Sequence, residues 1–562
     1  MTAKQAGFWR RHRVLKWALL VLLLGVGALG IAISVALEKA EPLLRAALIA
    51  GLEQRFHTHV ELDSFHISLA DGFWAEGKGL RIWPPRQSPS ATPLGAQLPA
   101  ASAPLVRLAE FRFHAPLRLK FGRPIRISVV ELTGLIVDVP PRTRLAHSAP
   151  APAPAPGAEP RAKPLLQFQV ESIRCRNAHL TLQTDKPGKI PLEFAIDRID
   201  LASPDGNGSM RFNARLTNPR PAGVILAEGS IGPWVVDDPG QTPLNGAYRF
   251  EHADLSVFKG IAGILQSTGN YAGVLRDLTV DGETVTPDFR LTSFGTAVPL
   301  RTAFHAQVDG TNGDTFLQPV RATLGQSHLI AEGKIVRVLP QTAANGFVTP
   351  GGHQIALNVT VDNGRIEDFL RLTSRSGTPL LTGALHLKTT LDLPPGTAKV
   401  EARLQLKGTF TLDDAQFTNP RIQNQVRQLS LRALGRPQDA RQEAAADVRS
   451  AMQSDFTMAG AIITLPNLEY TVPGAEIDLK GIYGVQDGGL DFTGAAKMQA
   501  TVSQIVGGWM GKLLKPADRL FSKDGAGTEI PVHVSGTRKD PSFGVDLGKL
   551  GHSVPVLPGE PQ

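Results

Sequence analysis

The sequence predicts a mainly β protein in which an N-terminal transmembrane helix precedes an elongated, curled antiparallel β sheet with an apolar groove and a few short helices. One apolar run near the N-terminus predicts the helix. From Val60 onward, apolar and polar residues alternate repeatedly, which is typical of strands with one solvated face. At one strand per ~15 residues the chain holds about 30 strands and only about four or five further helices. So few helices cannot cover the apolar faces of so many strands.

The apolar run is WALLVLLLGVGALGIAISVAL, from Trp17 to Leu37, and it has no charged side chain. At ~1.5 Å per residue this run spans roughly 30 Å, the thickness of a bilayer's hydrocarbon core. The preceding residues carry five Lys or Arg and no acid, so the N-terminus is expected in the cytoplasm and the rest of the chain is expected to be exported. A cleaved signal peptide is the alternative, because Ser34, Val35 and Ala36 form a small-x-small site. Ordinary signal peptides have apolar regions of only ~7–15 residues, which favours a retained anchor.

Composition excludes several classes of protein. The chain of 562 residues has 59 Lys and Arg, of which 54 follow the anchor and face 51 Asp and Glu. This near balance and the absence of a basic stripe exclude a nucleic-acid partner. Cys175 is the only cysteine, so an internal disulfide framework and a cysteine-rich metal site are excluded.

Composition and periodicity divide the chain into seven segments. These are a cytoplasmic basic segment (1–16), the transmembrane helix (17–37), an amphipathic helix (38–58), a β-rich region (59–435), a polar connector (436–452), a second β region (453–548) and a loose tail (549–562). Two stretches rich in Pro and Ala, 84–104 and 140–164, are expected as solvated loops inside the first β region. Short helices are expected at residues 254–267, 363–374, 418–435 and 501–521.

The most regular strand pair lies between residues 381 and 412. One side of its first strand presents Leu385, Leu387, Leu391 and Leu393, while His386 and Lys388 point to the other side. After a turn at Pro394–Gly396, a second strand is expected from Val400 to Leu412, with the same alternation. The predicted residues lining an apolar groove are Leu385, Leu387, Leu391, Leu393, Val400, Leu404, Leu406 and Phe410.

The chain shows no motif of a catalytic or cofactor site. It lacks a nucleophile elbow, a phosphate-binding loop and a zinc-protease helix. Gly25, Gly27 and Gly30 have the spacing of a dinucleotide fingerprint but lie inside the anchor. His57, His59, Glu61 and His66 could be written as a metal site, but solvated side chains on the polar face of a strand are the favoured interpretation. The sequence therefore predicts no enzyme activity, no cofactor and no metal.

Four segments together resemble the bacterial AsmA-like family of envelope proteins, which is related to TamB and YhdP. They are the N-terminal span, LEQRFHTHVELDSFHISL, GRIEDFLRLTSRSGTPLLTGALHLKTTLDLPPG and GAGTEIPVHVSGTRKDPSFGVDL. The resemblance covers most of residues 15–548. It departs from the family at His57-Thr58, where members often have Thr-Gly, and at the two Pro/Ala-rich loops.

The resemblance implies a single-pass protein of the bacterial inner membrane, with its bulk in the periplasm, that binds lipid acyl chains in a β groove. It also implies a role in phospholipid transport to the outer membrane, with phospholipid, the inner membrane, and outer-membrane or periplasmic proteins as partners. The alternative is a structural factor for outer-membrane protein biogenesis in which the sheets enclose an ordinary core.

Overall fold

The structure is a computed structural model of the full chain. It describes residues 41–42, 44–53, 58–68, 73–83, 104–115, 125–139, 168–183, 189, 191–202, 208–219, 221–233, 235, 238–293, 296–342, 348–373, 378–439, 448–506, 515, 518, 527–538 and 540–545. The predicted span Trp17–Leu37, the loop 140–164 and the tail 549–562 lie outside these ranges, as does nearly all of the loop 84–104. Within these ranges, no helix has the length and apolar character needed to cross a lipid bilayer.

The described chain is mainly β, with antiparallel strand pairs predominating and few helices, as the alternation predicts. It forms two compact units. Unit 1 comprises residues 1–185, 193–216 and 230–239, and unit 2 comprises residues 186–192, 217–229 and 240–562.

Unit 1 is a sheet in which β3 pairs with β1, β2 and β4, and β6 pairs with β4 on one side and β8 on the other. The β6–β8 pair is parallel. The strands of this unit, including most of β9 and β10, are β1 (Val60–Glu61), β2 (Ser64–Ser68), β3 (Phe73–Ile82), β4 (Val106–Ala115), β5 (Ile125–Ile127), β6 (Val130–Val139), β7 (Phe168–Val170), β8 (Ser172–Leu182), β9 (Leu192–Ala202) and β10 (Met210–Pro219).

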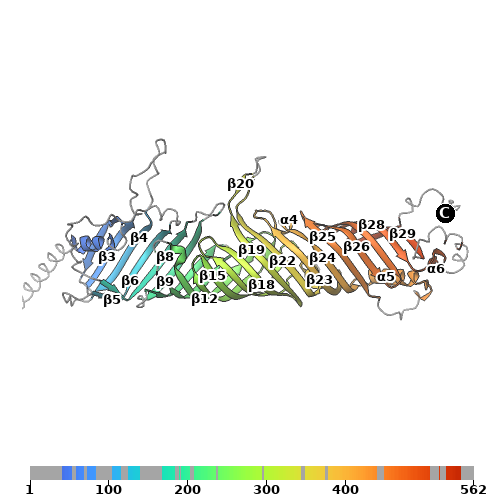
Figure 1. Ribbon diagram of the computed structural model, residues 1–562, viewed down its shortest axis with the longest axis horizontal. Coiled ribbons are helices and arrows are strands. Elements are labelled where there is room, and N and C mark those ends of the chain that lie inside the picture. Colours follow the sequence, from blue (N-terminus) through green and yellow to red (C-terminus); the bar gives the residue numbers. More distant parts are fainter. Residues whose placement is uncertain are drawn as a thin grey trace, which may run out of the picture. The chain divides into compact units, whose positions relative to one another are not determined.

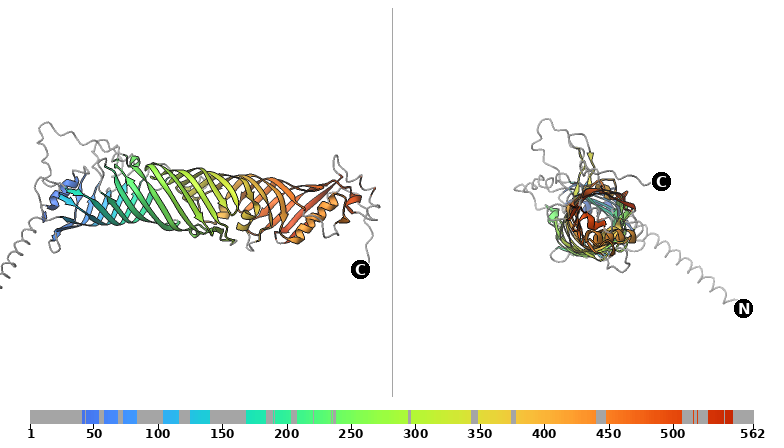
Figure 2. Two further views of the ribbon diagram at one scale, coloured as in Figure 1. Left: turned by 90° about the horizontal axis from the view of Figure 1, so that it is seen from below. Right: turned by 90° about the vertical axis from the view of Figure 1, so that its right-hand side faces the viewer.

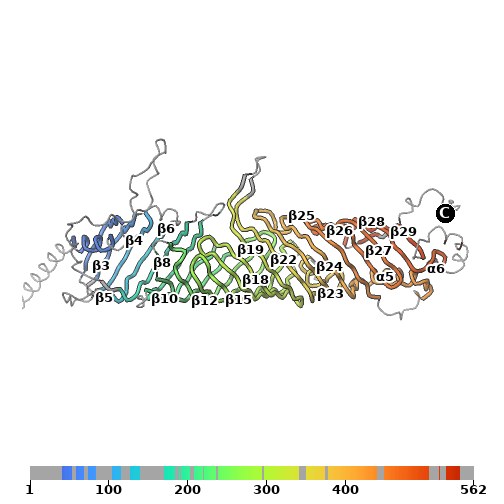
Figure 3. The backbone as a smooth tube through the Cα atoms, in the orientation of Figure 1, coloured from blue at the N-terminus to red at the C-terminus, as the bar shows by residue number. Residues whose placement is uncertain are grey.

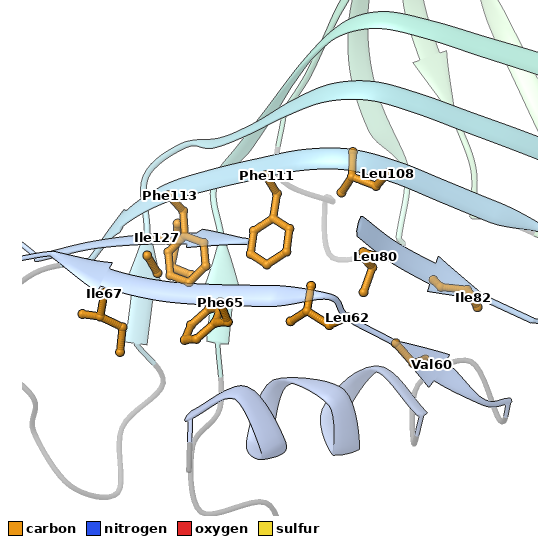
Figure 4. Close-up of a cluster of buried hydrophobic side chains, with 11 residues drawn as sticks. Val60, Leu62, Phe65, Ile67, Leu80, Ile82, Leu108, Phe111, Phe113 and Ile127 are labelled. Atoms are coloured by element: carbon orange, nitrogen blue, oxygen red, sulfur yellow. The ribbon is translucent and has the colours of Figure 1, made fainter. Parts of the chain in front are cut away.

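An amphipathic helix covers the core of unit 1. Residues 44–53 are helical, and Leu44, Leu48 and Leu52 of this segment pack against a cluster that includes Phe65 and Phe111. Figure 4 shows the cluster between the strands and this helix. The spacing of the apolar residues predicts this helix, and its apolar side caps a sheet rather than being left uncovered.

Unit 2 is one meander. Each long strand pairs antiparallel with the next one along the chain (Figures 1 and 3). The order is β12, β14, β15, β17, β18, β19, and then β22 through β30. The strands are tilted, and the sheet curls, as Figure 2 shows. The ladder is nevertheless open, because β30 pairs only with β29 among the described strands.

The strands of unit 2 run from β11, of which most belongs to this unit, to β30. Their bounds are β11 (Ala222–Ile231), β12 (Pro243–Asp254), β13 (Ile261–Ala262), β14 (Ile264–Val274), β15 (Asp277–Thr286), β16 (Arg290–Leu291), β17 (Leu300–Asp309), β18 (Asp314–Leu324), β19 (Ser327–Val338), β20 (Gln341–Thr342), β21 (Val348–Thr349), β22 (Gly352–Arg365), β23 (Leu381–Leu393), β24 (Gln405–Phe417), β25 (Ser450–Ala459), β26 (Ile462–Val472), β27 (Ala475–Gly484), β28 (Gly489–Met498), β29 (Thr528–Thr537) and β30 (Asp540–Val545).

Short helices occupy connections between strands. They are η1 (Pro239–Gln241), η2 (Leu255–Val257), α3 (Ile366–Leu372), α4 (Val400–Arg403), α5 (Pro420–Ala433) and α6 (Val502–Val506). The sequence predicts α3 and α5 correctly. In α5, Asn419 is the N-cap, its side chain accepts a hydrogen bond from the Arg421 amide, and Pro420 fits the first turn.

The helix predicted for residues 254–267 is wrong. This segment contains η2, β13 and the start of β14, with Gly260 and Gly263 at φ values of 109° and 140°. A helix cannot include such residues, and only glycine adopts these conformations without strain.

Candidate functional site

The candidate site is the apolar face of the sheet in unit 2, which we call the inner face. On β22 to β24 it is built in register: Leu387 of β23 lies opposite Val361 of β22 on one side and Phe410 of β24 on the other. Four residues along β23, Leu391 has Leu357 and Leu406 as its neighbours. Because side chains alternate along a strand, all of these point to one side of the sheet.

The same face continues to β29. The in-register neighbours are apolar or glycine at nearly every step; they include the pairs Leu406 and Met458, Met458 and Ile463, Ile463 and Tyr483, Tyr483 and Leu490, Phe492 and Val534, and Ala496 and Ile530. The opposite face carries exposed polar side chains, among them Lys388, Thr390, Lys407 and Thr409. The sheet of unit 2 is therefore apolar on its inner face and polar on its outer face over many strands.

The inner face is only partly covered by the rest of the described chain. Leu385 and Leu412 are buried beneath α3, whose Ile366 and Phe369 pack against them. Near the other end, α5 buries Val426 against the strands β26 to β28. Between these helices Leu387, Leu391, Leu406 and Phe410 stay half-buried. Apolar surface thus remains accessible along the middle of these strands.

The structure brings six of the eight predicted groove residues together on this face. They are Leu385, Leu387, Leu391 and Leu393 of β23 and Leu406 and Phe410 of β24.

The predicted strand from Val400 is wrong in its first part. Val400 lies in α4 and Leu404 is the C-cap of that helix, so β24 begins only at Gln405. Leu404 lies outside the strand but still packs, with Leu291, against the inner-face residues around Met458. One cause is tertiary, because the Val400 amide donates to Lys259 O. The other is local, because the Arg403 side chain donates to Pro394 O and Ala398 O of the same connection.

Glycine and aromatic residues face one another across several strand pairs of the inner face. Gly282 lies opposite Phe304, Gly269 opposite Tyr248 and Gly481 opposite Phe492. A methyl group added to any of these glycines would lie 2.7–2.8 Å from a ring atom of its partner. The rings therefore lie over glycine backbone, an arrangement that permits strong curvature of a sheet.

Tyr248 and a second tyrosine of the inner face, Tyr271, which lies opposite Gly246, are partly buried. The Tyr248 hydroxyl lies 3.0 Å from Ser267 Oγ, and Tyr271 Oη donates to Glu228 O at 3.4 Å. Burial raises the pKa of Tyr271 to about 12, with a smaller contribution from the Glu228 charge. Burial also raises the pKa of Tyr248. Both side chains are therefore neutral at physiological pH and act as apolar rings with one polar tip.

The described residues of the candidate metal cluster, His59, Glu61 and His66, lie in unit 1, and both histidines lie beside carboxylates. His59 Nδ1 is 3.2 Å from Glu53 Oε1 and its Nε2 is 3.5 Å from Glu61 Oε1. His66 Nδ1 is 3.6 Å from Glu41 Oε1, and His57 lies outside the described residues. The described residues contain no group of three His, Cys, Asp or Glu placed to hold a metal ion.

Cys175 is buried in β8, and burial raises the pKa of its thiol to about 11. A thiol in this environment is protonated and unreactive, since the thiolate is the nucleophile.

The sequence did not reveal the contribution of β22, nor the pairing of aromatic residues with glycines. Ile355, Leu357, Val359 and Val361 carry the inner face into β22 with the same alternation. Isolated glycines inside strand patterns are the signal for close backbone approach that could have found the second feature. Comparisons with known proteins return no match: neither a protein-family model, nor a curated protein, nor a solved structure matches the chain.

Proposed function

We propose that the protein binds lipid acyl chains along the inner face of unit 2, between α3 and α5. The observation that carries the proposal is the in-register apolar row from β22 to β29, whose middle residues stay half-buried. Fully burying a Leu or Phe side chain contributes ~1.5–3 kcal/mol, so an apolar ligand on this row is favoured over water. Acyl chains have the apolar, extended shape that such a row needs.

The proposed context is the bacterial envelope. The resemblance to the AsmA-like family and the predicted anchor at Trp17–Leu37 support an inner-membrane protein with its bulk in the periplasm. In that setting a lipid-binding sheet supports phospholipid transport toward the outer membrane. Neither unit needs a cofactor for this role.

A second function is favoured by the fully buried parts of the inner face. Beneath α3, Leu385 and Leu412 form an ordinary core with Ala415, so a structural factor for outer-membrane protein biogenesis is the alternative. The two functions differ in whether the middle of the inner face holds a ligand.

Mass spectrometry of lipid that co-purifies with the full chain tests the proposal. A double variant of the inner face, Leu387→Asp with Leu406→Asp, is compared with one of the outer face, Lys388→Asp with Lys407→Asp. We expect the inner-face variant to lose most of the bound phospholipid and the outer-face variant to keep it. Equal lipid content in wild type and both variants contradicts the proposal, because that lipid is then held elsewhere, for example around the anchor.

A further inference from the structure

Connections that lie at opposite ends of the strands of unit 2 touch one another. In an antiparallel meander, successive connections alternate between the two ends of the strands. By this count the connections β12–β14 (255–263), β15–β17 (287–299) and β22–β23 (366–380) lie at one end. The connections β23–β24 (394–404), β25–β26, β27–β28 and β29–β30 lie at the other end.

Two groups of contacts join these opposite ends. In the first, the Val400 amide donates to Lys259 O at 2.8 Å, and Ser293 Oγ donates to Glu401 Oε1 at 2.6 Å. In the second, Arg538 Nη1 donates to Thr373 O at 2.8 Å. In a flat sheet these partners would be five or more strand spacings of ~4.8 Å apart. The sheet therefore winds so far that connections at one end of the earlier strands touch connections at the opposite end of the later strands. We call this line of contacts, from Lys259 and Ser293 with α4 to Thr373 with Arg538, the seam.

The seam closes the inner face laterally, while the end near β28 is closed by a helix. Ile422, Val426 and Ala433 of α5 are buried, and α5 packs on the inner face of β26 to β28. A ligand of the inner face cannot pass that end without displacing this apolar helix. The seam near α4 is held by these hydrogen bonds and by Leu291, which packs with Leu404 against the cluster around Met458.

The seam carries a buried charge that is incompletely satisfied. Glu401 is 3% exposed, and its Oε1 accepts from Ser293 while Lys399 Nζ lies 3.9 Å away. Its Oε2 has no hydrogen-bond partner among the described residues and faces Gly260. A buried carboxylate oxygen without a partner destabilises the arrangement that buries it, and opening the seam would hydrate it. Hydrogen bonds thus stabilise the closed seam, and the desolvation of Glu401 Oε2 destabilises it.

We propose that the seam beside α4 is the gate of the inner face, with the Ser293–Glu401 contact as its latch, and that lipid enters and leaves laterally when this contact breaks. The proposal rests on the proposed lipid-binding function and adds the route by which the ligand reaches its site. Gly260 allows the close approach, since a methyl group there would lie 2.7 Å from Val400 N.

A cross-link across the seam tests the gate. Ser293→Cys with Glu401→Cys places two thiols where the side chains now hydrogen-bond, and the buried Cys175 does not compete. The full chain is bridged with a short bifunctional thiol reagent and mixed with vesicles containing a pyrene-labelled phosphatidylcholine. Lys407→Cys with Thr457→Cys is the control pair, because these exposed residues lie opposite each other on the outer face of β24 and β25, and a bridge between them joins neighbouring strands rather than the two sides of the seam.

We expect the seam cross-link to slow lipid uptake at least about tenfold relative to the same protein before bridging, with no change for the control pair. Equal uptake before and after bridging, with the fold intact by circular dichroism, overturns the gate and leaves the proposed function standing. No uptake by the wild-type chain overturns both.

Two single variants are expected to change the rate of lipid exchange in opposite directions, and they test the latch without a cross-linker. Ser293→Ala removes the latch donor and leaves Glu401 less satisfied, so we expect faster exchange of the pyrene-labelled lipid. Glu401→Gln keeps an acceptor for Ser293 but removes the buried charge that opposes closure, so slower exchange is expected. A change in the same direction for both variants contradicts the latch.

Discussion

Phe304 of β17 lies directly opposite Gly282 of β15, and its ring covers the glycine on the inner face of unit 2. The space that a side chain would take at Gly282 is occupied by this ring and by the backbone of the strand before it. The curvature of the sheet at β14 to β17 therefore depends on residue 282 having no Cβ atom.

Gly282→Ala is expected to destabilise unit 2. The added methyl group would lie 2.7 Å from Phe304 Cζ and 2.9 Å from Thr268 O, so ring and backbone must shift, at a cost of ~1–3 kcal/mol. The urea midpoint of unfolding of the full chain measures this loss. Gly489→Ala is the control, because its nearest atoms would be 3.4 Å away. The prediction fails if both variants unfold at the same urea concentration.

A charge should be tolerated at Leu387 but not at the residue opposite it, Val361. Val361 is 0% exposed, so Val361→Asp buries an unpaired carboxylate and is expected to cost about 4 kcal/mol or more. Leu387 is half-buried, so Leu387→Asp can reach solvent and should cost only ~1–2 kcal/mol. Circular dichroism during urea unfolding compares the two. If Leu387→Asp unfolds as readily as Val361→Asp, the middle of the inner face is a closed core.

Three tyrosines of unit 2, Tyr248, Tyr271 and Tyr470, should ionise late in an alkaline titration. The chain has four tyrosines, and burial raises the pKa of Tyr248, Tyr470 and Tyr271, the last to about 12. Absorbance at 295 nm should therefore keep rising well above pH ~10, where a free phenol is half-ionised. Tyr271→Phe should remove the step near pH 12, and the same step in wild type and variant would contradict the assignment.

The raised pKa also sets the sign of a pH effect on stability. An unfolded tyrosine loses its proton near pH ~10 while folded Tyr271 keeps it, so the free energy of unfolding should fall as pH rises through this range. Below pH ~10 both states are neutral and the contribution of Tyr271 is fully present. The urea midpoint of unfolding should therefore fall between pH 8 and pH 11. This fall should be smaller for Tyr271→Phe than for the wild type.

Local patterns in the sequence predicted the two faces of β23, because alternation with a period of two depends only on neighbouring residues. The helices α3 and α5 could also be predicted, since their apolar residues recur with the helical period and α5 has an N-cap residue. The register of β22, β23 and β24 could not be predicted, because nothing near Leu387 in the sequence specifies Val361 and Phe410 as its neighbours.

Contacts between distant segments account for the errors. Val400–Arg403 alternates like a strand, but Glu401 is held by Ser293, 108 residues earlier in the chain. The seam depends on how far the whole meander of unit 2 winds, which no local pattern encodes. The wrong helix at residues 254–267 belongs to the same region, where Gly260 lies against Glu401 and Val400.

Photo-cross-linking in cells tests the central claim most directly. A photo-reactive amino acid is placed in the full chain at Leu387 or Leu406 on the inner face, or at Lys388 or Lys407 on the outer face. The proposed function predicts covalent phospholipid adducts from the two inner-face positions and none from the two outer-face positions. Equal labelling of both faces, or no labelling at Leu387 and Leu406, would contradict it.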